Sequence, residues 1–255
     1  MTMTLADIDG KGALDLYVAD YRNDVAADRA EFDKVDVFNV NGQLIVVPAL
    51  RDRFVFTNGA LWEYGEPSLV YLNDGKGRFT PLSWTNGAFL DESGQPLTGP
   101  PRDWSLTAAF RDLNGDGAPD IYVCNDYWTP DRLWLNDGRG HFQACPPLAL
   151  RHTSLSAMGV DFADVDRDGR VDFCVVDMLA RDWQRRKRQI MISGMPRLPI
   201  GAIDNRPQIP RNMLFRNRGD GTFEEIAAYA GVAASGWSWQ LVFLDVDLDL
   251  SLIHI

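Results

Sequence analysis

Three short stretches of the sequence place acidic or amide side chains and glycine at a fixed spacing. They read DIDGKGALD, DLNGDGAPD and DVDRDGRVD, and they begin at Asp7, Asp112 and Asp164. All three fit the pattern Asp-x-(Asp/Asn)-x-x-Gly-x-x-Asp. Carboxylates at alternate positions of a tight loop can converge on one ion, and calcium prefers roughly six to eight oxygen ligands. Because these carboxylates would repel one another without a cation, the pattern predicts calcium loops.

The pattern also predicts which oxygens would hold the ion: the side chains at positions one, three, five and nine, and the backbone carbonyl at position seven. In the second loop these are Asp112, Asn114, Asp116, the Ala118 carbonyl and Asp120. In the third loop they are Asp164, Asp166, Asp168, the Arg170 carbonyl and Asp172. In the first loop Asp7, Asp9 and Asp15 match, but Lys11 brings a cation to position five. We therefore expect two calcium sites and a third, weaker one.

Two other structures can carry loops of similar composition. An EF-hand requires flanking helices and a glutamate at position twelve, but position twelve is Val18, Val123 or Val175. The flanking residues are β-branched and aromatic, which favours strands. The loops could also be solvated turns rich in Asp and Asn, and this alternative stays open.

A second motif alternates with the acidic loops. YLNDGKGRFT, WLNDGRGHFQ and FRNRGDGTFE begin at Tyr71, Trp134 and Phe215. Asn and Gly between apolar runs predict hairpin turns, because both residues tolerate a positive φ. Each repeat therefore reads as four short antiparallel strands, which is the size of a propeller blade. The fold class predicted is all-β: a β-propeller of four-stranded blades, incomplete, with about three to four blades.

The predicted organisation is a single partial propeller over residues 1–255. Blade 1 covers about residues 1–82 with an insert at 21–67, and blade 2 covers 104–146. Blade 3 covers 155–228 with an insert at 180–210, and a fourth blade starts at about 237 and runs to 255. In this last unit Asp245 and Asp247 fit the acidic pattern, but Leu250 and Ile253 do not. We therefore expect a piece of a longer protein.

Composition excludes several other classes of protein. The formal net charge is −11, which is unsuited to nucleic acid because phosphate binding needs a basic surface. No apolar run is long enough for a transmembrane helix, so no membrane insertion is expected. The three cysteines form no zinc or disulfide pattern. None of the three histidines has a Ser or Cys nucleophile at a known spacing, so no catalytic residue is predicted.

Two further features have open interpretations. The run RDWQRRKRQ, from Arg181 to Gln189, is the one basic cluster. It is interpreted as a solvated connection that contacts acidic neighbours, or alternatively as a contact for an anionic glycan or an acidic peptide. Among the tryptophans, Trp104, Trp237 and Trp239 precede first strands, so packing between blades is expected for them. Those in or near connections could pack or line a ligand surface: Trp62, Trp84, Trp128 and Trp183.

These motifs resemble a known family. The acidic loop followed by an apolar strand is similar to the FG-GAP (VCBS-type) repeat, which builds the propeller of integrin α-subunits. The segment LFRNRGDGTFEEIAAYAGVAASGWSWQLVFLDVD is similar to bacterial proteins of the cartilage-acidic-protein type, whose propellers commonly precede an ASPIC/UnbV domain. The resemblance implies calcium at the matching positions of the second and third loops.

The resemblance and the loops together predict a non-catalytic, calcium-dependent scaffold for protein or glycan recognition. The inserts would form its binding face, because insertions confined to one connection project from one face of a repeat array. A secreted, periplasmic or cell-surface location is expected, although no signal peptide is present in this chain. Self-association through open propeller edges is also expected. The alternative is a propeller lyase or hydrolase acting on polysaccharide, with an active site in the central funnel.

Overall fold

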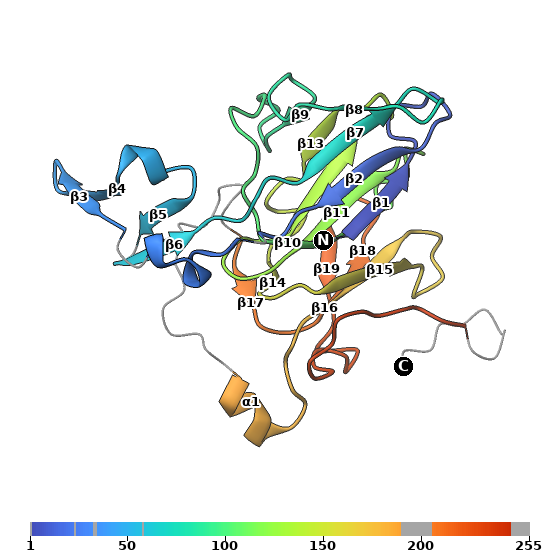
Figure 1. Ribbon diagram of the computed structural model, residues 1–255. Helices are drawn as coiled ribbons and strands as arrows, with labels where there is room; N and C mark the ends of the chain where they lie inside the picture. The colour runs from blue at the N-terminus through green and yellow to red at the C-terminus, as the bar shows by residue number, and fades with distance from the viewer. Residues whose placement is uncertain (1, 23, 33–34, 58, 190–205, 246–255) are drawn as a thin grey trace.

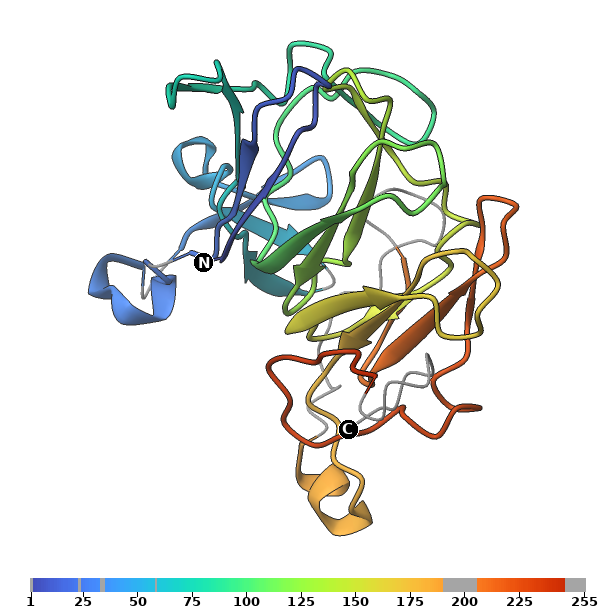
Figure 2. The same cartoon turned by 90° about the vertical axis from the view of Figure 1, so that its right-hand side faces the viewer.

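The computed structural model describes residues 2–22, 24–32, 35–57, 59–189 and 206–245. The predicted four-stranded antiparallel units are present in three sheets, and we call these units blades 1, 2 and 3 (Figures 1 and 2). Blade 1 contains β1 (Thr2–Ala6), β2 (Asp15–Ala19), β7 (Leu69–Asn73) and β8 (Phe79–Pro81). Blade 2 contains β10 (Ser105–Arg111), β11 (Asp120–Asn125), β12 (Arg132–Asn136) and β13 (Phe142–Ala144). Blade 3 contains β15 (Gly159–Ala163), β16 (Asp172–Val176), β18 (Met213–Asn217) and β19 (Phe223–Glu225).

The three blades share one strand register, which confirms the repeat. The residue before each acidic loop pairs with the ninth residue of that loop: Ala6 with Asp15, Arg111 with Asp120, and Ala163 with Asp172. Each glycine-rich turn likewise joins an Asn–Phe pair: Asn73 with Phe79, Asn136 with Phe142, and Asn217 with Phe223. Acidic loops and glycine-rich turns therefore lie at one end of every blade, which we call the loop end. The connection between second and third strands lies at the other end, which we call the insert end.

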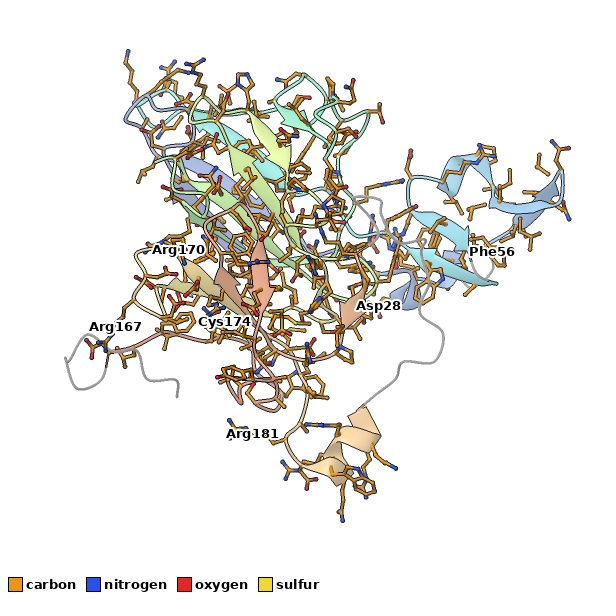
Figure 3. All side chains as sticks on the ribbon, turned by 180° about the vertical axis from the view of Figure 1, so that it is seen from behind. Asp28, Phe56, Arg167, Arg170, Cys174 and Arg181 are labelled. Carbon is orange, nitrogen blue, oxygen red and sulfur yellow. The ribbon has the colours of Figure 1, made fainter. Side chains whose placement is uncertain are left out.

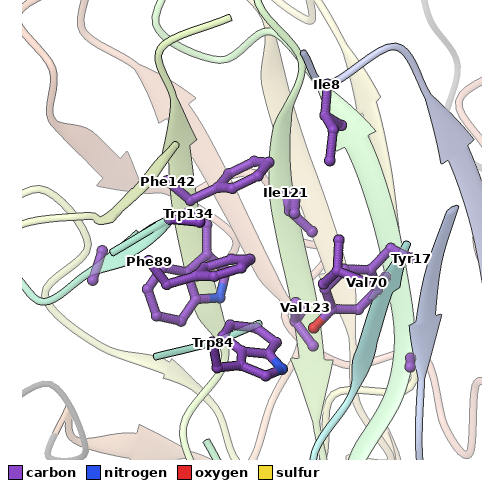
Figure 4. Packing of buried hydrophobic residues seen from close by; sticks show 13 residues of the cluster. Ile8, Tyr17, Val70, Trp84, Phe89, Ile121, Val123, Trp134 and Phe142 are labelled. Carbon is purple, nitrogen blue, oxygen red and sulfur yellow. The ribbon is translucent and has the colours of Figure 1, made fainter. Parts of the chain in front are cut away.

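The core lies between the blades, because successive strand residues point to opposite faces of a sheet. In β11, Ile121 and Val123 pack towards blade 1, while Tyr122 and Cys124 pack towards blade 3. Figure 4 shows the first interface, where the rings of Phe89 and Phe142 stack at 5.1 Å beside Trp134. Full burial of side chains of this size stabilises a fold by about 1.5–3 kcal/mol each. The blades are therefore held mainly by apolar packing between neighbouring sheets.

The described blades form an open arc, not a closed ring. Neighbouring first strands are joined directly, since Thr2 donates to the Leu106 carbonyl at 2.7 Å and Thr107 donates to the Met158 carbonyl at 2.8 Å. Among the described residues, no strand pairing or core cluster joins blade 1 to blade 3. The outer face of blade 3 is covered by the start of the fourth unit, where Leu241 and Phe243 pack on Cys174 and Leu214.

The described residues include only the beginning of the predicted fourth blade, up to residue 245. Asp247, Leu250 and Ile253 lie outside the described residues. The expected packing of Trp237 and Trp239 between blades is wrong, because their side chains are 63% and 62% exposed. By contrast, Trp104 and Trp84 are buried at 5% and 8% exposure.

The inserts add smaller elements. The first insert contains 3-10 helices at Ala26–Asp28, Ala30–Phe32 and Pro48–Leu50, and two hairpins: β3 (Val37–Val40) with β4 (Gln43–Val46), and β5 (Phe54–Thr57) with β6 (Ala60–Glu63). The second begins with α1 (Trp183–Gln189), and β17 (Gln208–Ile209) pairs with β14 (Thr153–Ser154). β9 (Phe89–Leu90) pairs in parallel with β13 and adds a fifth strand to the sheet of blade 2. No helix in the described residues is both long and apolar enough to cross a membrane.

Candidate calcium loops and the insert end

The first aspartate of each acidic loop closes that loop through backbone hydrogen bonds. The Asp112 carboxylate accepts from the backbone N–H of Gly115 at 2.7 Å and of Gly117 at 2.8 Å. Asp7 and Asp164 also accept two backbone N–H bonds each, from positions five and six of their own loops, whereas the donors to Asp112 are positions four and six. The glycine at position six has a positive φ, +88° at Gly117, a conformation that other residues rarely adopt. The hydrogen bonds of the motif therefore define the shape of the loop without a bound ion.

The ninth aspartate has a role that sequence reasoning missed. Asp15, Asp120 and Asp172 are fully buried. Each accepts two backbone N–H bonds, one from loop position two and one from the asparagine of the glycine-rich turn. The donors to Asp120 are Leu113 at 2.9 Å and Asn136 at 2.8 Å. These aspartates therefore connect the two turns of each blade, whether or not they also bind a metal.

Burial raises the pKa of all three of these aspartates. The effect is largest at Asp120, where the pKa rises to about 7. Desolvation is the main cause, and the negative charges of Asp116 and Asp112 add to it, while the two backbone donors act in the opposite direction. A bound cation would favour the charged form.

The three loops differ in the cations that already lie beside them. In the first loop the Lys11 ammonium is 2.6 Å from the Asp9 carboxylate, as expected from the sequence. In the third loop Arg170 pairs with Asp168, and the Arg216 guanidinium lies 3.8 Å from Asp166. Within the described part of the chain, no lysine or arginine forms an ion pair with an acidic side chain of the second loop.

The second loop is closed instead by its own polar groups. The Asn114 amide donates to Asp116 at 2.9 Å, and Asp116 accepts from the Ala118 backbone at 2.8 Å. Among the described residues, the second loop is therefore the one whose negative charge has no side-chain counter-ion.

The donor geometry fits a hard divalent cation. Carboxylate oxygens of Asp7, Asp9 and Asp15 lie within 4.8 Å of one another, and so do those of Asp164, Asp166 and Asp172. No further group of three acidic side chains at this spacing is found in the described residues, since position three of the second loop is an asparagine. Asp168 is outside the third group, because its carboxylate pairs with Arg170. An all-oxygen donor set suits calcium, and the assignment of these residues as ligands stays a prediction.

The first insert is fixed to the blades at the insert end. The indole N–H groups of Trp104 and Trp128 both donate to the Glu63 carbonyl, at 3.2 and 3.0 Å. Within the insert, Arg22 donates to the carbonyl of Tyr64 at 2.9 Å and so joins its two ends. A Cβ at Gly65 would lie 1.8 Å from the Asp103 carbonyl oxygen, so only glycine fits this approach. Of the two roles open to Trp128 from the sequence, the structure shows packing, because Trp128 holds the insert against blade 2.

Beyond this attachment, the insert exposes apolar side chains. In the β3–β4 hairpin, Phe38 is 53% exposed, Val40 46% and Leu44 42%. Figure 1 shows this hairpin projecting on the left, away from the acidic loops. Exposed apolar side chains that gather in one patch often mark an interaction site.

Acidic side chains also gather where second strands end, near the expected funnel. Burial raises the pKa of Asp126 and Asp177. Asp177 accepts from the Ser154 hydroxyl at 2.5 Å and from two backbone N–H groups, and Asp126 accepts from the Tyr21 hydroxyl at 3.4 Å. These contacts explain both carboxylates structurally, and the polysaccharide-enzyme alternative stays a prediction.

Comparison with known proteins agrees with the repeat. Residues 112–175 match the family described as FG-GAP-like repeat. No curated protein matches the sequence. Among solved structures, one similar chain is an Agrocybe aegerita lectin, described as recognising non-reducing terminal N-acetylglucosamine. It is 19% identical with a TM-score of 0.33, and the match covers 88% of this chain. This chain spans about half of the lectin, 50% of its length, and a likeness this weak supports no inference about ligand.

Proposed function

We propose that this chain is a calcium-binding FG-GAP-type propeller that acts as a non-catalytic scaffold for glycan or protein recognition. The observation that carries the proposal is the separation of its two ends. Acidic loops and glycine-rich turns lie at the loop end, where hydrogen bonds connect them within and between blades. The inserts lie at the insert end, and the first of them is attached by Trp104 and Trp128.

Calcium is proposed first for the second loop, because no side-chain cation in the described part of the chain offsets its charge. Its ligands would be Asp112, Asn114, Asp116, the Ala118 carbonyl and Asp120. The third loop would bind more weakly, since Arg170 must release Asp168, and the first more weakly still, since Lys11 occupies position five. When bound, the ion supplies positive charge that offsets carboxylate repulsion. A secreted, periplasmic or cell-surface location suits loops of modest affinity.

Hydrogen–deuterium exchange tests whether calcium binds at the loop end and not at the insert end. Calcium chloride should slow exchange in the second and third acidic loops and in the strands beside them. Exchange in the β3–β4 hairpin should be unchanged, because that hairpin has no contact with the loop end. The proposal would be contradicted if calcium chloride protected the loops no more than magnesium chloride does, or if it protected mainly the inserts.

We also propose that the chain self-associates through blade 1. The leading face of blade 1, meaning the side turned away from blade 2, carries Met3, Leu5, Leu69 and Phe79 at 69%, 52%, 43% and 43% exposure. The corresponding residue to Phe79 in blade 2, Phe142, is fully buried by its neighbouring blade. An exposed apolar sheet face of this kind favours association.

Light scattering across a concentration series tests the association. The wild-type mass should rise with concentration, and Leu5→Glu should keep the chain monomeric. Tyr229→Glu is the matched control, because Tyr229 is 94% exposed but lies outside the leading face. A wild-type chain that stays monomeric throughout would contradict the proposal.

A further inference from the structure

The basic cluster of the second insert forms an exposed cationic surface. It consists of Arg181 and the α1 residues Arg185, Arg186, Lys187 and Arg188. None of these five side chains forms an ion pair with a carboxylate of the described residues. Figure 1 shows α1 projecting from the blades, and Figure 3 shows Arg181 beside it, well apart from Arg170. The exposure of the cluster fits the solvated connection expected from the sequence, and its contact with acidic neighbours is, among the described residues, a hydrogen bond from the Arg185 backbone to Asp182.

The two expected acidic neighbours are used elsewhere. Asp177 is 3% exposed and accepts hydrogen bonds from Ser154 and from backbone groups. Asp182 accepts from the backbone N–H of Arg185 at 2.8 Å, so its carboxylate supports the start of α1. The positive charge of the cluster therefore persists on a chain whose formal net charge is −11.

Two of the five cations hold the surface in place, and three extend from it. Arg181 donates to the Ala234 carbonyl at 2.8 Å and Arg186 to the Ala180 carbonyl at 3.0 Å. Arg185, Lys187 and Arg188 make no such side-chain hydrogen bond to a described residue. They lie on a helix of about 10 Å, so the three positive charges lie close together, with Arg185 and Arg188 on one face and Lys187 beside Trp183.

An aromatic ring lies within the same surface. Trp183 is 64% exposed, and the Lys187 ammonium lies 4.3 Å from its ring centroid. An exposed indole offers an apolar face to a sugar ring, while arginines bind carboxylate and sulfate through paired N–H groups. Trp183 is the one large apolar side chain on α1, which is too little apolar surface for a membrane-bound helix.

We propose that α1 and Arg181 bind an anionic polysaccharide that carries sulfate or carboxylate groups. This inference rests on the proposed recognition function and names the ligand class of its second insert. The polymer's charges pair with the arginines and Lys187, and Trp183 packs against a sugar ring. Acidic peptides and anionic membranes are the competing partners, and they are separated by the experiment below.

The experiment compares two triple variants with the same change in net charge. Arg185→Ala/Lys187→Ala/Arg188→Ala removes three cations from α1. Lys76→Ala/Arg78→Ala/Arg139→Ala removes three cations from the glycine-rich turns at the loop end. Calorimetry with heparin, as the sulfated probe, and alginate, as the carboxylated probe, should show binding by wild type to at least one. The α1 variant should lose about tenfold or more of this affinity, and the loop-end variant little.

The salt dependence of the affinity and a Trp183 variant test the proposal further. Wild-type affinity should fall steeply with salt because polyanion binding releases counterions, and the α1 variant should show a shallower dependence. Trp183→Ala should weaken binding without changing that salt dependence. Unchanged melting temperatures in all variants confirm folding.

The proposal is overturned by no binding to either polysaccharide, or by equal losses in the two triple variants. It is also overturned if polyglutamate or phosphatidylserine vesicles bind as tightly as the polysaccharides. Measurement in EDTA keeps this test separate from the calcium proposal, because loss of calcium binding leaves the charges of α1 unchanged.

Discussion

The side-chain amide of Asn136 donates a hydrogen bond to the backbone carbonyl of Ile8, at 3.1 Å, across the boundary between blades 2 and 1. Asn217 makes the equivalent bond to Leu113, at 2.8 Å, across the boundary between blades 3 and 2. Both carbonyls belong to position two of the preceding acidic loop. Asn73 has no preceding blade in the described structure, and its amide donates to Leu14 of its own blade. One asparagine thus joins a glycine-rich turn to two acidic loops.

Removal of these asparagines should destabilise the fold in proportion to the bonds lost. Asn136→Ala and Asn217→Ala should each lower the free energy of unfolding by about 1–3 kcal/mol, because buried partners lose their donors. Asn73→Ala should cost less, since Asn73 crosses no blade boundary. Urea unfolding measures all three. An equal loss in Asn73→Ala would show that the interblade bonds add nothing.

The repeat could be predicted from sequence because its signals are local. Asn-Gly turns and alternating apolar residues such as Ile121 and Val123 specify hairpins and faces without knowledge of distant partners. The interblade bonds of Asn136 could not be predicted, since they depend on how two sheets pack. The Arg170–Asp168 ion pair could not be predicted either. The calcium-loop pattern specifies only the backbone carbonyl at position seven, so it does not predict the direction of the Arg170 side chain. The expectation for Trp237 was wrong because no described sheet covers it.

Lys11 should lower the calcium affinity of the first loop. Its ammonium lies beside Asp9, where a calcium ligand would be needed. Lys11→Asp replaces this cation by a carboxylate and should make the weak first site bind calcium more tightly, which calorimetric titration can measure. Lys76→Asp, with the same charge change in the glycine-rich turn of blade 1, should leave the affinity of the first loop unchanged. Equal calcium affinity of the first loop in Lys11→Asp and wild type would contradict this role of Lys11.

Asp131 should make stability depend on pH. Burial raises the pKa of this carboxyl to about 8, despite hydrogen bonds from Asn125 and Tyr122. The folded state therefore holds a proton that the unfolded chain releases near pH 4, so stability falls as pH rises between these values, by up to about 1.4 kcal/mol per pH unit. Asp131→Asn removes this contribution.

Thermal unfolding from about pH 5 to about pH 8 checks this sign. The wild-type melting temperature should fall relative to that of Asp131→Asn as pH rises. Parallel curves for the two proteins would mean that Asp131 is ionised in the folded state throughout.

Trp128 should control the rigidity of the first insert. Trp128→Phe keeps an aromatic ring beside Trp62 and Tyr64 but removes the hydrogen bond to Glu63. Amide exchange in β5 and β6 should become faster, while the blades stay protected. Trp84→Phe, which loses a hydrogen bond to Ser68 inside blade 1, should leave the hairpin unchanged. Equal effects of both variants on β5 and β6 would argue against a local attachment.

The central claim is that the second acidic loop binds calcium and stabilises the scaffold. The most direct test measures the melting temperature of wild type and Asp116→Asn in calcium chloride and in magnesium chloride, with Asp137→Asn as the control. At about a hundredfold excess over Kd, calcium should raise the wild-type melting temperature by roughly 5–10 °C. Asp116→Asn should lose most of this shift and Asp137→Asn little. A calcium shift no larger than that of magnesium, or an undiminished shift in Asp116→Asn, would contradict the account.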